Sequence, residues 1–159
     1  MDSINALARQ RGITVVEDCA HAPGALYNGR KAGSLGDIGV FSFHQQKNMV
    51  TLGEGGMVTT SSRSMFDRML SYRSLCCRSY DPKGKYLAID EGQQPMGQRY
   101  WYLDFDDIGY NFRMTDAQAA VGVTQLAKLD GFNQCRIELA NCYCERLRGI
   151  RGLTSPYVS

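Results

Sequence analysis

The sequence predicts an α/β fold, with a mostly parallel sheet, flanking helices and a long C-terminal helix. Two observations support this prediction. An amphipathic segment at residues 2–11 precedes a β-branched, apolar run at residues 13–17, and a helix followed by a buried strand is the alternation of α/β sheets. Apolar residues then recur at helical spacing from residue 115 to Leu147.

The N-terminal part is expected to consist of short elements joined by glycine-rich turns. Residues 2–11 form a helix that ends at Gly12, and residues 13–17 form a strand buried on both faces. The sequence Tyr-Asn-Gly-Arg-Lys at residues 27–31 is typical of a tight hairpin turn. Further strands are predicted at residues 38–43 and 57–60, separated by the turn Gly-Glu-Gly-Gly at residues 53–56.

The C-terminal part is expected to contain two helices separated by a long irregular segment. Residues 64–75 have helical spacing, whereas residues 78–105 are polar, aromatic and interrupted by proline and glycine. The long helix begins after Thr115, which caps it together with Gln118, and Gly131 is a candidate kink. The chain thus divides into residues 1–114, with a long loop at 78–105, and residues 115–159.

Length and composition are those of a single soluble domain. The chain has 159 residues, of which 43% are hydrophobic and 21% charged, and its net charge is +2. This balance predicts no nucleic-acid partner and no membrane partner. No apolar run approaches the roughly 20 residues of a membrane span, and the N-terminus lacks a secretory core, so we expect a cytoplasmic protein. The six cysteines lack zinc-ligand spacing and are expected to be reduced thiols.

Two chemical groups are expected to meet at one edge of the sheet. Glu17 and Asp18 end one strand, and Lys47 follows another. Because α/β sheets bind ligands beyond the carboxyl ends of their strands, an acid and an amine there can hold opposite sides of an aromatic aldehyde. The pattern suggests pyridoxal 5'-phosphate (PLP), with which a lysine forms a Schiff base while an acid steadies the pyridinium nitrogen. Position alone also permits an ordinary surface lysine.

Neighbouring polar residues extend this hypothesis without deciding it. The hydroxyl of Ser42 can donate to a phosphate, although a serine bonded to its own backbone is the more ordinary role. Asp18 and His21 can contact a cofactor, bind a metal together with Glu17, or form a polar strand end. The glycine patterns lack the spacing of dinucleotide-binding and P-loop fingerprints.

Four motifs follow one another in a specific order. They are Val-Val-Glu-Asp-Cys-Ala-His from residue 15, Gly-Asp-Ile-Gly-Val-Phe-Ser-Phe-His-Gln-Gln-Lys-Asn from residue 36, Gly-Glu-Gly-Gly-Met-Val-Thr-Thr from residue 53 and Gly-Tyr-Asn-Phe-Arg-Met-Thr-Asp-Ala-Gln from residue 109. Together they resemble the DegT/DnrJ/StrS family of PLP-dependent sugar aminotransferases, over about residues 2–150. The resemblance implies the aspartate-aminotransferase-like fold, with residues 1–114 in the large PLP-binding domain and residues 115–159 leading into the small C-terminal domain.

The resemblance implies a role for five residues. Lys47 matches the lysine that binds the cofactor and moves protons during amino transfer, and Asp18 matches the acid that pairs with the pyridinium nitrogen. His21 lies where the family has Gln or His against the ring's phenolic oxygen. Ser42 matches a hydroxyl that binds the cofactor phosphate, and Asn111 matches an asparagine offered to the phosphate of the neighbouring subunit's cofactor. The implied partners are a nucleotide-sugar, an amino acid and a second subunit in a homodimer.

The same resemblance sets the expected function. A related branch that removes a sugar hydroxyl has a histidine in place of the lysine; Lys47 argues against that branch, and His44 is out of register. Family members are longer, so we expect this chain to be the middle of a parent enzyme and to be inactive by itself. The parent is expected to transfer an amino group, with glutamate as the expected donor, to a nucleotide-linked keto sugar. The alternative is a remnant of this fold without cofactor turnover.

Overall fold

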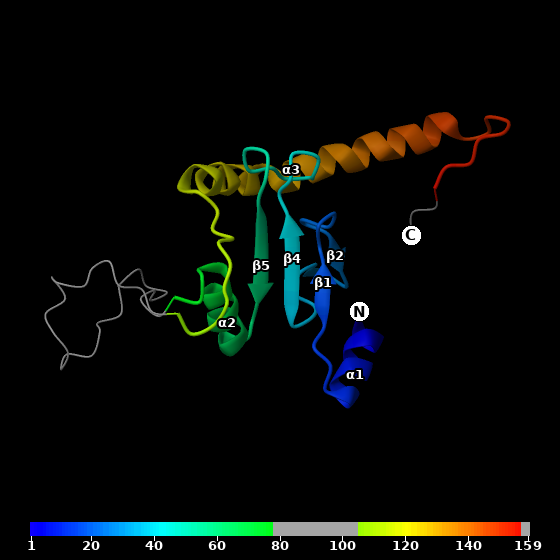
Figure 1. Ribbon diagram of the computed structural model, residues 1–159. Helices are drawn as coiled ribbons and strands as arrows, with labels where there is room; N and C mark the ends of the chain where they lie inside the picture. Colours follow the sequence, from blue (N-terminus) through cyan, green and yellow to red (C-terminus); the bar gives the residue numbers. More distant parts are fainter. Residues whose placement is uncertain (78–104, 157–159) are drawn as a thin grey trace, which may run out of the picture.

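The structure, a computed structural model, describes residues 1–77 and 105–156. Within these ranges it shows helices and short strands in α/β alternation (Figure 1). Nearly all of the predicted loop at residues 78–105 lies outside the described residues. The elements are α1 (Asp2–Arg11), β1 (Val16–Asp18), β2 (Leu26–Tyr27), β3 (Arg30–Lys31), β4 (Ile38–Ser42), β5 (Gly56–Thr60), α2 (Arg63–Arg73) and α3 (Asp116–Leu147).

The main sheet has the strand order β1-β4-β5 and mixes two kinds of pairing. β1 runs parallel to β4, with Asp18 opposite Val40, whereas β5 runs antiparallel to β4. The prediction of a mostly parallel sheet is therefore wrong for the described strands. The reason is the connection, because the chain turns back directly between β4 and β5 and has no crossover helix there, which parallel pairing requires.

The first strand is more exposed than its sequence suggests. The β-branched run at residues 13–17 predicts burial on both faces, but Ile13 is 61% exposed and Val16 is 58% exposed. The strand itself covers only Val16–Asp18 and lies at the edge of the described sheet, with a paired neighbour on one side. The prediction of two-sided burial is thus wrong here, because β-branched side chains favour a strand but burial depends on what packs over it.

The second sheet is the hairpin that the sequence predicts. β2 and β3 pair antiparallel through a turn formed by Asn28 and Gly29. These residues have φ values of 50° and 74°, as two-residue hairpin turns of this kind require. α1 likewise ends as predicted at Gly12, whose φ is 61°.

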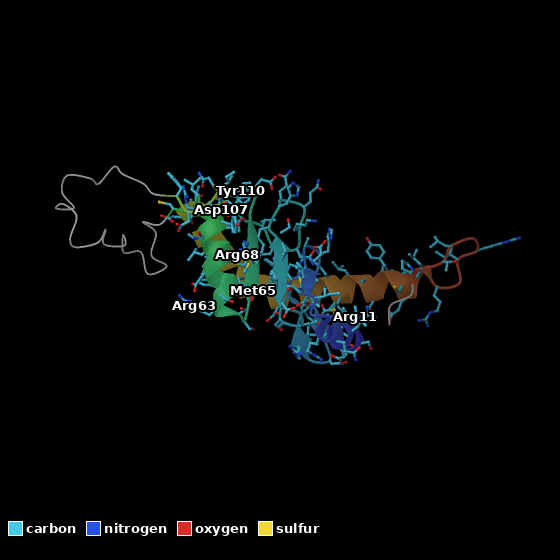
Figure 2. The ribbon with its side chains drawn as sticks, turned by 60° about the horizontal axis from the view of Figure 1, so that its bottom comes forward. Arg11, Arg63, Met65, Arg68, Asp107 and Tyr110 are labelled. Carbon is cyan, nitrogen blue, oxygen red and sulfur yellow. The ribbon has the colours of Figure 1, made fainter. Side chains whose placement is uncertain are left out.

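α2 packs with the segment that precedes α3, on the β5 side of the sheet. The hydroxyl of Tyr72 donates to Asp107 Oδ2 at 2.8 Å, and the amide of Tyr110 donates to the carbonyl of Tyr72 at 2.8 Å. Figure 2 shows Asp107 and Tyr110 beside α2, whereas Arg11 of α1 lies on the other side of the strands. The sheet is thus flanked by one helix at each side.

α3 crosses the end of the sheet toward which β1 and β4 point (Figure 1). It begins with the predicted capping box, in which Thr115 and Gln118 each accept a hydrogen bond from the other's amide. The helix continues unbroken to Leu147, past the glycine predicted as a kink. Its Leu129 joins Phe43 and Met49 in the buried core cluster. α3 therefore closes the core at the edge where β1 and β4 end.

None of the helices in the described parts of the chain combines the length and the apolar character needed to cross a membrane.

Candidate active site

Two loops meet at the edge of the sheet where β1 and β4 end. Because these strands are parallel, the chain leaves both of them at the same edge. His21 follows β1 and Lys47 follows β4, and Lys47 Nζ lies 2.8 Å from His21 Nε2, a hydrogen-bond distance. His21 is exposed and Lys47 is half-buried. The topology of the sheet thus brings together two predicted site residues that are 26 positions apart.

The loop that carries Lys47 is closed at its base and anchored inside the protein. The amide of Gln45 donates to the carbonyl of Gly53 at 2.8 Å, which joins the two ends of the loop. Thr51 is fully buried and donates its hydroxyl to the carbonyl of Glu54 at 3.1 Å. These contacts fix the backbone on both sides of Lys47 and limit the positions that its amine can reach.

Asp18 and Ser42 lie on the same face of the sheet. Asp18 is opposite Val40, and Ser42 is two residues further along β4, so the alternation of side chains sends all three to one face. The Oδ1 atom of Asp18 accepts from the amide of Ala20 at 3.0 Å, which orients the carboxylate. Ser42 Oγ accepts from the amide of His44 at 3.4 Å, and its own hydrogen remains available to a ligand. An acid and a hydroxyl therefore share one face beside the Lys47 loop.

Glu17 has a role that the sequence analysis missed. Its neighbour Asp18 points to one face, and Glu17 points to the other, opposite Gly39. There its carboxylate accepts three backbone amide hydrogens, from Gly33 at 2.9 Å, Leu35 at 2.7 Å and Gly36 at 2.7 Å. The glycines in this turn are the sequence signal for such a close backbone approach. Glu17 is thus a structural anchor and not a partner of Asp18 in a joint metal site.

The electrostatics of Glu17 agree with this role. Burial alone raises the pKa of the Glu17 carboxyl, but hydrogen bonds from Gly36, Gly33 and Leu35, with the positive charge of Arg30 nearby, outweigh it and lower the pKa. The carboxylate is therefore ionised in the folded protein at neutral pH, the form that accepts all three amide hydrogens.

The thiol of Cys19, between Asp18 and His21, is held in its neutral form. Cys19 is only 2% exposed, and burial together with the charges of Glu17 and Asp18 raises the pKa of its thiol. A thiol that resists ionisation is a poor nucleophile. The Cys19 thiol is thus not a candidate nucleophile at this edge.

Asn111 lies in another part of the molecule. It pairs with Ser74 through an isolated β-bridge, in the segment that runs beside the end of α2. Its side chain is exposed. The structure therefore brings His21 and Lys47 together but leaves Asn111 at a separate surface.

A groove of about 800 Å³ lies between β4, β5, α2 and the segment before α3. Most of its walls are apolar side chains, and neither Asp18, His21 nor Lys47 lines it. The stacked rings of Tyr110 and Phe112, with centroids 4.8 Å apart, form part of one wall. The groove thus reaches Val40, the strand partner of Asp18, and Glu54 at the end of the Lys47 loop, but not Lys47 itself.

Comparison with known proteins identifies the family of the chain. Residues 1–158 match the DegT/DnrJ/EryC1/StrS aminotransferase family. The chain belongs to this family. The family that the four motifs predict is thus confirmed, whereas the roles of Asp18, His21 and Lys47 stay predictions.

Individual family members match nearly the whole chain. GDP-perosamine synthase of Escherichia coli O157:H7 is 38% identical over 150 residues, which are 94% of this chain and 35% of that protein. An aminotransferase of Psychrobacter cryohalolentis has a TM-score of 0.74 at 37% identity, over 91% of this chain and 34% of its own. A GDP-4-keto-6-deoxy-D-mannose-3-dehydratase from E. coli, solved with bound hydrated PLP, has a TM-score of 0.77 at 26% identity, over 94% of this chain and 37% of its own. The chain thus spans little more than a third of these relatives.

The residues of this edge fit the cofactor that the family uses. The aldehyde of PLP reacts with an amine, its ring nitrogen pairs with an acid, and its phosphate binds hydrogen-bond donors. Lys47, Asp18 and Ser42 supply one of each. The partner of the Lys47 amine is an imidazole and not a carboxylate, so the amine is not tied into an ion pair with an acid. The three groups belong to two strands and their loops, on one edge of the sheet.

Proposed function

We propose that this chain forms the lysine-bearing part of the site in a longer PLP-dependent enzyme, which transfers an amino group from an amino acid to a nucleotide-linked keto sugar. Glutamate is the proposed donor. The observation that carries the proposal is the 2.8 Å contact between Lys47 Nζ and His21 Nε2, at the edge that also holds Asp18. Membership of the aminotransferase family and the similarity to a GDP-perosamine synthase support a nucleotide-sugar as acceptor.

Lys47 is the proposed catalytic residue. Its amine stands beside an imidazole nitrogen, so that one of the two nitrogens donates the hydrogen and the other accepts it. This contact orients the amine and places beside it a group with which it can exchange a proton. When bound, PLP supplies an electron sink for the negative charge that forms beside the transferred amine. With the cofactor bound, Lys47 would hold and move the proton at the carbon that bears the transferred amine, as a general acid and base at a fixed position.

Asp18 and Ser42 are the proposed orienting residues. The Asp18 carboxylate is held by the amide of Ala20 through one oxygen, which leaves Oδ2 to keep a proton on the ring nitrogen of the cofactor. The Ser42 hydroxyl would donate to the phosphate. His21, in the same proposal, faces the phenolic oxygen of the ring as well as the lysine. Each residue thus binds a different atom of the cofactor.

Asn111 is proposed to act across a dimer interface. It is exposed and lies apart from Lys47, in the segment beside α2. In the proposed homodimer, a residue on that exposed surface is free to bind the cofactor phosphate of the second subunit. Loss of cofactor affinity in Asn111→Ala, restored by mixing with subunits that lack only Lys47, would support this placement.

The lysine distinguishes two reactions within the family. One of the similar structures is a dehydratase by name. The resemblance implies that the branch that removes a sugar hydroxyl has a histidine where this chain has Lys47. A lysine keeps the amine that amino transfer requires. We therefore propose amino transfer and not removal of the hydroxyl.

The proposal is tested by trapping the cofactor on its lysine. The purified protein is incubated with PLP and reduced with borohydride, and the modified lysine is identified by peptide mass spectrometry. We expect the label on Lys47 and its loss in Lys47→Arg, whereas Lys128→Arg, which also removes one lysine, keeps it. Label spread over the other lysines, with Lys47 unmodified, would contradict the proposal and support a remnant without cofactor turnover.

A second measurement tests the reaction. The whole enzyme is supplied with glutamate and a nucleotide-linked 4-keto sugar, and formation of 2-oxoglutarate is followed together with the amino sugar. Equal amounts of both products are expected. A product that has lost a hydroxyl and gained no amine would assign the protein to the dehydratase branch.

A further inference from the structure

A short series of hydrogen bonds, made by two side chains of α3, joins the two loops of the candidate site. Asn133 Nδ2 donates to the carbonyl of Pro23 at 2.9 Å, two residues beyond His21. Asn133 Oδ1 accepts from Arg136 Nη1 at 3.1 Å, and Arg136 Nη2 donates to the carbonyl of Asn48 at 3.2 Å, one residue beyond Lys47. One amide side chain and one guanidinium therefore connect the loop of the histidine with the loop of the lysine.

The turn after His21 is shaped to receive Asn133. A Cβ atom at Gly24 would lie 2.6 Å from Asn133 Nδ2, and the φ of Gly24 is +86°. Any other residue there would both strain the backbone and displace the amide. Pro23, whose carbonyl accepts the hydrogen bond, is buried. The close fit indicates that the contact is a built feature of the fold and not an incidental surface bond.

α3 itself is fixed where it makes these contacts. Leu129, one turn before Asn133, is 6% exposed and packs with Phe43, which precedes the Lys47 loop, and with Met49 inside it. Residues four and seven positions after Leu129 lie on the same face of the helix. The packing of Leu129 in the core thus sets the position of α3 along its axis and its rotation about that axis. Both decide where Asn133 and Arg136 reach the two loops.

We propose that Asn133 and Arg136 are positioning residues that set the spacing between His21 and Lys47. Neither touches the reacting atoms. Each holds a backbone carbonyl next to one member of the pair, and their mutual hydrogen bond makes the two loops move together. The value of this device for catalysis rests on the proposed function, but the spacing itself is a property of the chain.

The contributions of the two residues differ. The contact of Asn133 with Pro23 is partly buried and worth about as much as one ordinary hydrogen bond, whereas Arg136 is exposed and its charge is screened by water. We therefore expect the larger effect from Asn133→Leu, which keeps the volume and removes the donor. Arg136→Gln is expected to act in the same direction and more weakly.

The experiment measures the reactivity of the Lys47 amine by trace labelling with acetic anhydride, without cofactor, relative to Lys128 in the same molecule. His21→Leu defines the change that results from losing the contact. Asn133→Leu is expected to shift Lys47 labelling in the same direction by about threefold to tenfold, the range for one lost hydrogen bond. The matched controls on α3, Gln134→Leu and Arg146→Gln, are expected to leave it unchanged.

A double variant separates positioning from general loosening of the fold. In the His21→Leu background, Asn133→Leu is expected to have no further effect on Lys47 labelling, because the contact it positions is already gone. Additive effects, or equal effects of Gln134→Leu, would overturn the proposal. Because labelling needs no PLP, a protein that fails the cofactor-trapping test can still pass this one, and the two failures are distinguishable.

Discussion

The turn before β4 and the loop after β4 are held by opposite means. The turn at residues 33–36 is held by Glu17, a side chain from the neighbouring strand within 19 positions. The loop at residues 44–54 depends on α3, through contacts such as that between Arg136 and Asn48, which are 88 positions apart. Residues close in sequence thus hold the turn that leads into the sheet, whereas the loop of the candidate active site is held by a helix from the far end of the chain.

The largest effect on the loop at residues 44–54 is expected from removing the core anchor of α3. Leu129→Ala is expected to lower the free energy of unfolding by about 2–5 kcal/mol, because it leaves a cavity between Phe43 and Met49. Hydrogen exchange should increase in the loop at residues 44–54 and not in the turn at residues 33–36. Urea unfolding and exchange mass spectrometry measure both effects.

The matched control for Leu129 is on the same helix. Leu126 is 61% exposed, so Leu126→Ala is expected to change the free energy of unfolding by no more than about 0.5 kcal/mol. Equal losses in the two variants would mean that α3 is not anchored through Leu129.

The converse variant removes the anchor of the turn. Glu17→Gln is expected to cost about 1–3 kcal/mol, since a neutral amide replaces a carboxylate that accepts three backbone hydrogens. Amide exchange should increase at residues 33–36 and stay unchanged at residues 44–54. Asp67→Asn, which weakens one exposed ion pair with Arg63, is the control and should be nearly neutral. Faster exchange in both regions would show that they are not independent.

The contribution of Glu17 to stability is expected to depend on pH. The folded state lowers the pKa of Glu17, so its contribution is fully present above the ordinary glutamate pKa of about 4.3 and is lost as the pH falls through the lower folded value. We expect the difference in unfolding free energy between wild type and Glu17→Gln to shrink as the pH decreases below 4.3. Urea titrations of both proteins at a series of pH values measure it, and a difference that grows on acidification would refute the assignment.

The smallest effect is expected at the exposed contact between α3 and the hairpin. Lys31 Nζ lies 3.2 Å from Asp130 Oδ1, but both side chains are more than half exposed. Asp130→Asn is therefore expected to change the free energy of unfolding by about 0–1 kcal/mol, and less at high salt. A larger loss, insensitive to salt, would mean that polar surface contacts as well as Leu129 fix α3.

Much of the local structure follows from short stretches of sequence. The Asn28-Gly29 turn, the glycine stop of α1 and the capping box at Thr115 are each set by residues within a few positions of one another, and each is present. The position of Asp18 at the end of β1 and that of Lys47 in the loop after β4 were predicted in the same way. Their proposed roles in binding a cofactor remain predictions, since they depend on the whole enzyme.

Other features were decided by packing between distant segments. β-branched residues at 13–17 specify a strand, but only neighbouring layers decide whether it is buried, and the direction of β5 depends on the route of the chain between strands. The 2.8 Å approach of His21 to Lys47 arises because two parallel strands end at one edge. The sequence by itself determines the kinds of side chain and the local turns, because turns depend on residues a few positions apart. The spacing of the candidate site requires the tertiary structure, because residues such as Asn133 and Pro23, 110 positions apart, must meet.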